Sequence, residues 1–287
     1  MHTDAKNSFR ERAGHSIPIT QHTMKLIIII AVSATTILSA CKKESAAQYN
    51  NNVKAPLSIE FDNIVGSSNL QLNTGVYQNA VGQNFSVTKL KYYISNIKLT
   101  NSKGEVFVVP QNESYFLIDE AVPSSHKPVV NIPEGEYTKL DFVLGIDSLR
   151  NTMDVSQRTG ALDVSGAAAD MYWTWNSGYI FFKLEGTSPI ITSMGGVFQY
   201  HVGGFGGYST PTISNLKNFS IDLTARGIPK VMNGRTPNVH LFVDVMKAIS
   251  GSTNYDFSTT TMIHSPAAAV PIRNNYSNMF SHDHTEN

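Results

Sequence analysis

The chain has 287 residues with 22 basic and 22 acidic side chains, so its formal net charge is zero. Without the first 40 residues, which carry four basic and two acidic side chains, the net charge is −2. No basic stripe is present, which argues against nucleic acid as a partner. Cys41 is the only cysteine, so an intramolecular disulfide is excluded.

The N-terminal part has the pattern of a lipoprotein signal peptide. Lys25 precedes an apolar stretch over residues 26–38, and small residues lead into Cys41. A positive residue, a short apolar segment and small residues before a cleavage site define an export signal. The stretch is also short for a membrane-spanning helix, which needs roughly 20 apolar residues. We therefore expect translation from Met24, lipidation of Cys41 and no part for residues 1–40 in the fold.

The next segment, residues 41–54, is almost free of apolar side chains and predicts a flexible tether behind the lipid. A lipid chain holds a protein on a membrane without spanning it. We expect an outer-membrane lipoprotein that faces the periplasm or the cell surface. Residues 55–287 are long enough for one sizeable domain, and nothing in them is typical of a linker.

This domain alternates apolar and polar residues in short segments that Gly, Asn and Pro separate, which is typical of β-strands. We expect strands at 57–61, 70–72, 85–88, 90–99, 106–109, 115–118, 140–146, 179–184, 196–202, 218–223 and 238–245, and two strands joined by a turn within 129–137. Residues 148–170 predict a loop with one short helix, and no long amphipathic helix is evident. The expected fold is all-β: a single-domain antiparallel β-sandwich, barrel-like, with long loops.

The most unusual segment is residues 171–186, which holds both tryptophans of the chain. Trp173 and Trp175 are two positions apart, so on a strand they share one face. Two large rings on one face are most often part of a core. The same pair could instead offer a stacking platform for a ligand.

The domain also contains six histidines: His126, His201, His240, His264, His282 and His284. Imidazole is the commonest metal ligand, and thioether sulfur favours Cu(I). With the only thiol lipidated, a soft-metal site would use His and Met. Roles without a specific metal site stay open for four of these histidines. His201 could donate or accept a backbone hydrogen bond, and His240 could form a surface pair with Asp244. His282 and His284 could bind metal weakly and adventitiously in a frayed tail.

Several segments together resemble the MbnP-like copper-binding family. They are Lys89-Leu90-Lys91-Tyr92-Tyr93-Ile94-Ser95-Asn96-Ile97, Gly135-Glu136-Tyr137, Phe142-Val143-Leu144-Gly145-Ile146-Asp147, Met171-Tyr172-Trp173-Thr174-Trp175-Asn176-Ser177-Gly178-Tyr179 and Tyr200-His201-Val202-Gly203. The resemblance spans roughly residues 55–280. Its most specific part is the Trp-x-Trp-x-x-Gly-Tyr block together with the later His-x-Gly.

The resemblance implies copper handling outside the cytoplasm, with a di-haem cytochrome c peroxidase-like (MauG-like) partner that oxidises a tryptophan to kynurenine. It makes Trp173 and Trp175 the candidates for modification. His201 becomes the first candidate copper ligand, followed by Met171 and His240. Related kynurenine sites use a Trp-x-His pairing, whereas Thr174 and Trp175 follow Trp173 here. The second ligand therefore stays open.

Catalysis finds no support in the sequence. There is no Gly-x-Ser-x-Gly elbow, and the glycines at 203, 204, 206 and 207 do not lead into a helix pattern as a phosphate-binding loop would. We expect a binding protein and not an enzyme. The alternative to copper is a surface β-sandwich lipoprotein that binds carbohydrate or protein through its aromatic cluster.

Overall fold

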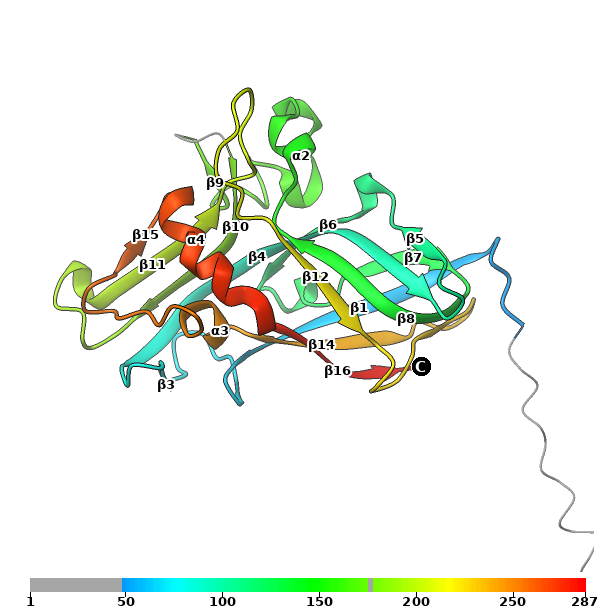
Figure 1. Cartoon of the computed structure of the whole chain (residues 1–287), viewed down its shortest axis with the longest axis horizontal. Coiled ribbons are helices and arrows are strands. Elements are labelled where there is room, and N and C mark those ends of the chain that lie inside the picture. Colours follow the sequence, from blue (N-terminus) through cyan, green and yellow to red (C-terminus); the bar gives the residue numbers. More distant parts are fainter. Residues whose placement is uncertain (1–47, 175–177) are drawn as a thin grey trace, which may run out of the picture. The chain divides into compact units, whose positions relative to one another are not determined.

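The computed structural model describes residues 48–174 and 178–287, which form two β-sheets (Figure 1). The smaller sheet consists of β1 (Lys54–Val65), β2 (Ser68–Asn69), β7 (Val129–Pro133), β14 (Asn238–Asp244) and β16 (Phe280–Glu286). Its order is β16-β14-β1-β2, and β7 pairs with the first part of β1.

The larger sheet has the order β12-β8-β4-β10-β11-β15, with short strands added to β4, β8 and β10. Its strands are β3 (Tyr77–Gln78), β4 (Asn84–Asn101), β5 (Val106–Val108), β6 (Tyr115–Asp119), β8 (Gly135–Leu144), β9 (Tyr172–Trp173), β10 (Gly178–Thr187), β11 (Val197–Gly203), β12 (Lys217–Asp222), β13 (Lys230–Val231) and β15 (Met262–Ile263). The all-β fold class is confirmed. Most pairs are antiparallel, but β1 pairs with β14 and β11 with β15 in parallel.

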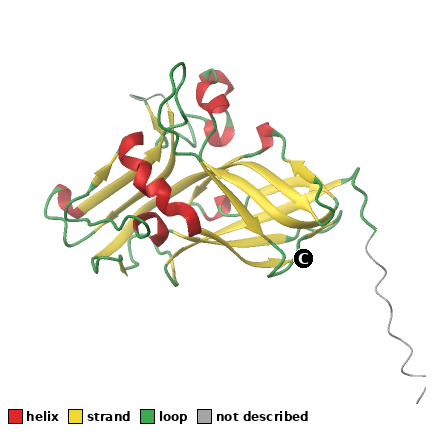
Figure 2. Cartoon of the chain, in the orientation of Figure 1, coloured by secondary structure: helices red, strands yellow, loops and turns green. Residues whose placement is uncertain are grey.

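The helices are short, as Figure 2 shows. The α-helices of the described residues are α2 (Ser148–Thr152), α3 (Met246–Ile249) and α4 (Pro266–Asn275), and 3-10 helices lie at Gln111–Glu113, Pro123–Ser125, Val155–Gln157, Gly160–Leu162, Met194–Gly196 and Tyr276–Asn278. The Ser265 side chain caps α4 by accepting from the Ala268 amide at 3.4 Å, and Pro266 takes a first-turn position that needs no N–H. Within residues 48–174 and 178–287, no helix is long and apolar enough to cross a membrane.

The main core lies between the two sheets. Alternate residues of β1 and β14 face it, and they meet apolar side chains from β4, β8, β10 and β11. Aromatic rings connect the layers: Phe61 of β1 lies 6.0 Å from Phe142 of β8 and 6.2 Å from Phe280 of β16, with near-perpendicular planes. Edge-to-face geometry of this kind suits the quadrupoles of aromatic rings.

A second apolar cluster covers the opposite face of the larger sheet. It contains Tyr93, Ile146, Leu162, Ala168, Met171, Trp173, Tyr179, Ile180, Phe181 and Phe205. The segment between β8 and β10 supplies much of it. As expected, this segment is largely a loop with a short α-helix, α2, whose first turn is capped by the Asp147 side chain; it also holds two 3-10 helices, Val155–Gln157 and Gly160–Leu162. The loop therefore closes one end of the sheet and carries Trp173 onto it.

Three sequence expectations were wrong. Residues 70–72 are not a strand, because after β2 the Leu70 amide donates to the Asn63 carbonyl and the chain enters a turn at 72–74. A ten-residue helix, α4, stands where no helix was expected. The C-terminal tail does not fray but forms β16 along β14.

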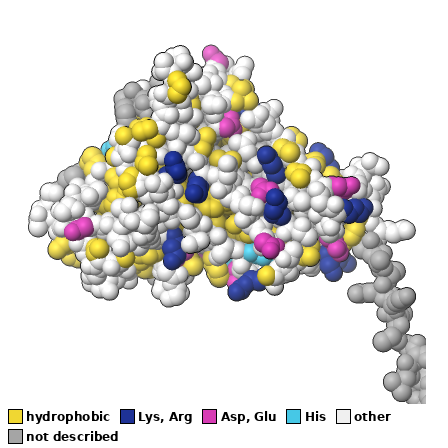
Figure 3. All heavy atoms as spheres, in the orientation of Figure 1, with side chains coloured by type: hydrophobic (Ala, Val, Ile, Leu, Met, Phe, Trp, Pro, Cys, Tyr) yellow, Lys and Arg dark blue, Asp and Glu magenta, His cyan; other side chains and the backbone are white. Residues whose placement is uncertain are grey.

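On the face drawn in Figure 3, acidic and basic side chains are intermixed.

Candidate functional site

The outer face of the larger sheet carries an unusual row of polar residues. Lys183 of β10 is paired with Lys91 of β4 on one side and with His201 of β11 on the other. Cross-strand partners put their side chains on the same face. Two lysines and a histidine therefore stand next to one another across three strands, beneath the loop that carries Met171 and Trp173.

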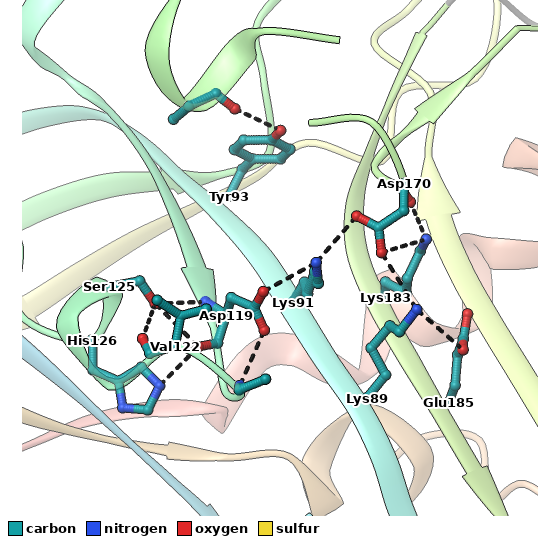
Figure 4. A network of polar contacts seen from close by, with 12 residues as sticks. Lys89, Lys91, Tyr93, Asp119, Val122, Ser125, His126, Asp170, Lys183 and Glu185 are labelled. Atoms are coloured by element: carbon teal, nitrogen blue, oxygen red, sulfur yellow. Dashed lines mark hydrogen bonds and ion pairs between the residues drawn. The ribbon is translucent and has the colours of Figure 1, made fainter. Parts of the chain in front are cut away.

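Three carboxylates balance the lysines in a lysine–acid network, defined here as Lys89, Lys91, Lys183, Asp119, Asp170 and Glu185 (Figure 4). Lys91 Nζ lies 3.0 Å from Asp119 and 3.1 Å from Asp170. Lys183 Nζ donates to the Asp170 backbone oxygen and lies 3.6 Å from its carboxylate. Asp170 is thus the hub that ties the covering loop to the sheet.

The network shifts the acidities of its members. Burial alone would raise the pKa of Asp170, but the ammonium groups of Lys183, Lys91 and Lys89 outweigh it and hold that pKa below its usual value. Burial lowers the pKa of Lys183, and the charges of Asp170 and Glu185 only partly offset this. The ion pairs therefore favour the charged form of Lys183 against the effect of burial.

His201 ends this row and is joined to a second histidine. Its Nε2 lies 2.8 Å from Glu185 Oε1, and only 9% of the residue is exposed. The His264 ring stacks on the His201 ring with centroids 4.3 Å apart and planes inclined by 19°. Tyr200 of β11 pairs in parallel with Ile263 of β15, and this pairing brings together the residues that follow them in the chain, His201 and His264.

The electrostatics of this His201–His264 pair favour neutral imidazole at His264. Burial lowers the pKa of His264, and the neighbouring His201 lowers it further. The hydrogen bond with His201 lowers the pKa of Glu185 against the effect of burial. Within the described part of the chain, His264 Nε2 is buried without a hydrogen-bond partner. A buried orphan nitrogen on a neutral ring is suited to accept a ligand.

The Trp173 side chain, from β9, packs on the face of β11 to which His201 also points. A Cβ built on Gly203 would come within 2.6 Å of Trp173 Cζ3, so the indole packs directly over that glycine. Gly203 is two residues beyond His201 and therefore shares its face, about 7 Å along the strand. Trp173 is 5% exposed and Met171 is fully buried in the second cluster.

His240 stands elsewhere, on β14 of the smaller sheet. Its Nδ1 lies 3.2 Å from Asp283 Oδ2, and its ring stacks on that of His284 with centroids 4.8 Å apart. His201 and His240 thus belong to different sheets and contact different residues. The two histidines predicted as copper ligands therefore do not share one site.

Cys41 and Trp175 lie outside the described residues. The sequence did not single out His264 as the partner of His201, nor Asp283 and His284 as partners of His240. Both partnerships come from pairing between strands far apart in the chain, for which the sequence holds no local signal.

The fold and these sites define a class of protein: an all-β domain that carries two histidine clusters on the outer faces of its two sheets. Within the sequence, residues 54–266 match the MbnP family, so the chain belongs to the MbnP family. No curated protein matches it. Among solved structures it is similar to MbnP from Methylosinus trichosporium, with 17% identity and a TM-score of 0.47, over 71% of this chain and 80% of that one.

Proposed function

We propose that the chain is a lipid-anchored, extracytoplasmic copper-binding protein that serves copper acquisition or homeostasis by binding and not by catalysis. Its membership of the MbnP family supports this. The observation that carries the proposal is the stacked His201–His264 pair, with its unpartnered buried nitrogen among the described residues, on the face of β11 that Trp173 also occupies.

The residues of this face fit a copper ion. Imidazole nitrogen suits copper in either oxidation state, and Glu185 adds a carboxylate 2.8 Å from His201. His201 and His264 would hold the ion, and Glu185 would orient the His201 ring as carboxylates do around metal-bound histidines. Met171 would join only if its thioether left the apolar cluster in which it is buried.

We further propose that Trp173 or Trp175 is oxidised to kynurenine by a di-haem, MauG-like partner. Two hydrogen peroxide molecules each transfer one oxygen atom to the indole and are reduced to water. The indole ring opens in this oxidation and gives N-formylkynurenine. Hydrolysis then releases formate and frees an aromatic amine that can bind copper. Trp173 is buried, but Thr174 beside it is exposed, so the segment reaches a surface that a partner can approach.

The carbohydrate-binding alternative requires an open aromatic face. Trp173 does not provide one, because the indole packs over Gly203 with 5% of the residue exposed. Stacking on a sugar ring needs the ring face in solvent. The burial of Trp173 therefore favours the copper proposal.

The test is to express the full chain with and without a co-expressed di-haem peroxidase-like protein. Copper per chain would be measured by elemental analysis, together with the mass of the peptide that carries both tryptophans. We expect stoichiometric copper that is lost in His201→Ala and His264→Ala and kept in the control His126→Ala. No stoichiometric copper in either preparation would overturn the proposal.

The anchor has a separate test. Metabolic labelling with a radioactive fatty acid should mark the wild-type protein and not Cys41→Ser, and the wild-type protein should fractionate with the outer membrane. Equal labelling of both proteins, or of neither, would remove the anchor from the proposal without touching copper binding.

A further inference from the structure

A second cluster lies where β14 meets the C-terminal strand β16, and two of its three residues, Asp283 and His284, lie beyond the family match, which ends at residue 266. Within residues 48–174 and 178–287, one donor atom from each of His240, Asp283 and His284 lies within 4.8 Å of the other two. We propose that these three residues, the β14–β16 cluster, bind a divalent transition-metal ion such as Zn²⁺. This proposal is independent of the proposed copper site.

A β-bulge builds the cluster. In the pairing of β14 with β16, Leu241 faces His282 and His240 faces His284, so Asp283 is left without a partner position. In a regular strand, successive side chains point to opposite faces. The extra residue breaks this alternation, so Asp283 and His284 both lie beside His240. Bulges commonly re-aim side chains in this way at functional sites.

The separations fit metal ligands. Asp283 Oδ2 lies 3.2 Å from His240 Nδ1 and 2.8 Å from His284 Nδ1. Two ligands that each lie about 2.1 Å from a tetrahedral ion are about 3.4 Å apart, so binding would need the His284–Asp283 pair to open by a few tenths of an ångström. Two imidazoles and one carboxylate form a ligand set typical of zinc and related divalent ions, with positions left for water.

The far side of each ring also meets a carboxylate. His240 Nε2 lies 3.7 Å from Asp62 Oδ2, and His284 Nε2 lies 3.6 Å from Glu286 Oε1. Metal-bound histidines almost always present their second nitrogen to a carboxylate, a carbonyl or water, which fixes the ring and its tautomer. Here both rings turn Nδ1 to Asp283 and Nε2 to another acid.

The hydrogen bonding of His240 also supports a metal site. Its Nδ1 is buried and has no hydrogen-bond partner in the described ranges, although Asp283 Oδ2 is close. His284 already engages the same oxygen by a 2.8 Å hydrogen bond. One carboxylate oxygen between two ring nitrogens, of which only one is bonded, is an arrangement that an ion would complete.

The surroundings are acidic overall. Asp62, Glu60 and Glu286 face the cluster besides Asp283 itself, against Lys127 at 2.9 Å from Glu60 and Arg226 at 3.7 Å from Asp283 Oδ1. Arg226 approaches the oxygen that the histidines do not use. With neutral histidines the local charge is therefore negative, which attracts a cation. The His284 side chain is 46% exposed, so an ion has a path in.

The test is a Zn²⁺ titration of the full chain, purified in detergent without a polyhistidine tag and stripped of metal. We expect one zinc ion per chain by calorimetry. His240→Ala, His284→Ala and Asp283→Asn should each weaken binding by at least about tenfold. His126→Ala is the matched control, because His126 is a half-buried histidine 3.6 Å from an acid, Glu120, elsewhere in the fold. It should leave binding unchanged.

The outcomes separate the two sites. Zinc binding that disappears in His201→Ala and persists in His240→Ala would place the ion at the other histidine pair and overturn this proposal, as would no binding at all. Asp283→Asn keeps the shape of the side chain, so it stands in if an alanine variant unfolds. Stoichiometric binding unchanged in all three β14–β16 variants would also refute the site.

Discussion

The imidazole rings of His201 and His264 stack with centroids 4.3 Å apart, although they come from strands far apart in the chain. The contact depends on the parallel pairing of β11 with β15, in which Tyr200 faces Ile263. Glu185 orients the first ring and burial keeps the second one neutral. His264 therefore offers a nitrogen lone pair beside His201 in an environment that disfavours protonation of the His264 ring.

Replacing His264 should impair copper binding as strongly as replacing His201. We expect His264→Ala to lower copper affinity by at least about tenfold, because it removes a ligand and leaves Glu185 and His201 paired only with each other. Competition with a chelator of known affinity would measure it. Unchanged affinity in His264→Ala alongside a loss in His201→Ala would show that the stack is structural.

Asp170→Asn should destabilise the fold. The substitution leaves the buried Lys183 without its main acidic partner and weakens two further lysine contacts. We expect a loss of roughly 1–3 kcal/mol in the free energy of unfolding, less than for a fully buried pair because the Asp170 side chain is 38% exposed. Urea denaturation would measure it.

The control is Lys183→Met, alone and combined with Asp170→Asn. If the cost arises from an unpaired buried charge, the double variant will be more stable than Asp170→Asn alone. Strictly additive losses would instead mean that Asp170 acts through its other lysines or through the loop backbone.

Acid should loosen the covering loop through the same residue. The pKa of Asp170 is lower in the folded chain than its ordinary value near 3.8, so the unfolded chain takes up the proton more readily. The stabilisation is therefore complete above about pH 4 to 5 and is lost as the pH falls through and below the unfolded pKa. Urea midpoints between neutral pH and pH 3 should fall less in Asp170→Asn than in the wild type.

Gly203→Ala should disturb Trp173 directly. The added Cβ would lie 2.6 Å from Trp173 Cζ3 and 2.7 Å from the Tyr179 backbone oxygen, so ring and strand must both move. Overpacking of this kind costs about 1–3 kcal/mol, and tryptophan fluorescence should shift. Gly178→Ala is the matched control, because its nearest neighbours lie at 3.5 Å. Equal effects of the two substitutions would contradict the close packing.

Local patterns explain what the sequence could predict. Alternation over 90–99 and 238–245 identified β4 and β14, because one buried face imposes a period of two. The bulge at Asp283 breaks that period, which is why β16 was read as a tail. No helix was expected over 266–275, although Ser265-Pro266 is a helix start with a cap.

The candidate sites were harder to foresee for a different reason. The family resemblance singled out His201 and His240 among six histidines, but their partners His264, Asp283 and His284 arise from strand pairing across the sheets. Ligand sets depend on such register, which no single segment encodes. The resemblance therefore gave one member of each cluster, and topology gave the others.

The C-terminal strand should be essential to the core. Phe280 packs against four rings, with centroids 4.6 Å from Phe219, 5.0 Å from Phe142, 6.1 Å from Tyr92 and 6.2 Å from Phe61. Truncating a buried aromatic ring leaves a cavity and costs about 3–5 kcal/mol. We expect Phe280→Ala to lower the free energy of unfolding by that amount in urea denaturation.

Val108→Ala is the control for Phe280→Ala, because Val108 is 54% exposed on an outer strand and its truncation should change stability little. A frayed tail would make both substitutions equally mild.

Because β16 also presents Asp283 and His284 beside His240, zinc should raise the unfolding midpoint of the wild type. If Phe280→Ala detaches β16, zinc should raise the unfolding midpoint of this variant less than that of the wild type. If β16 stays in place, zinc should raise both midpoints equally.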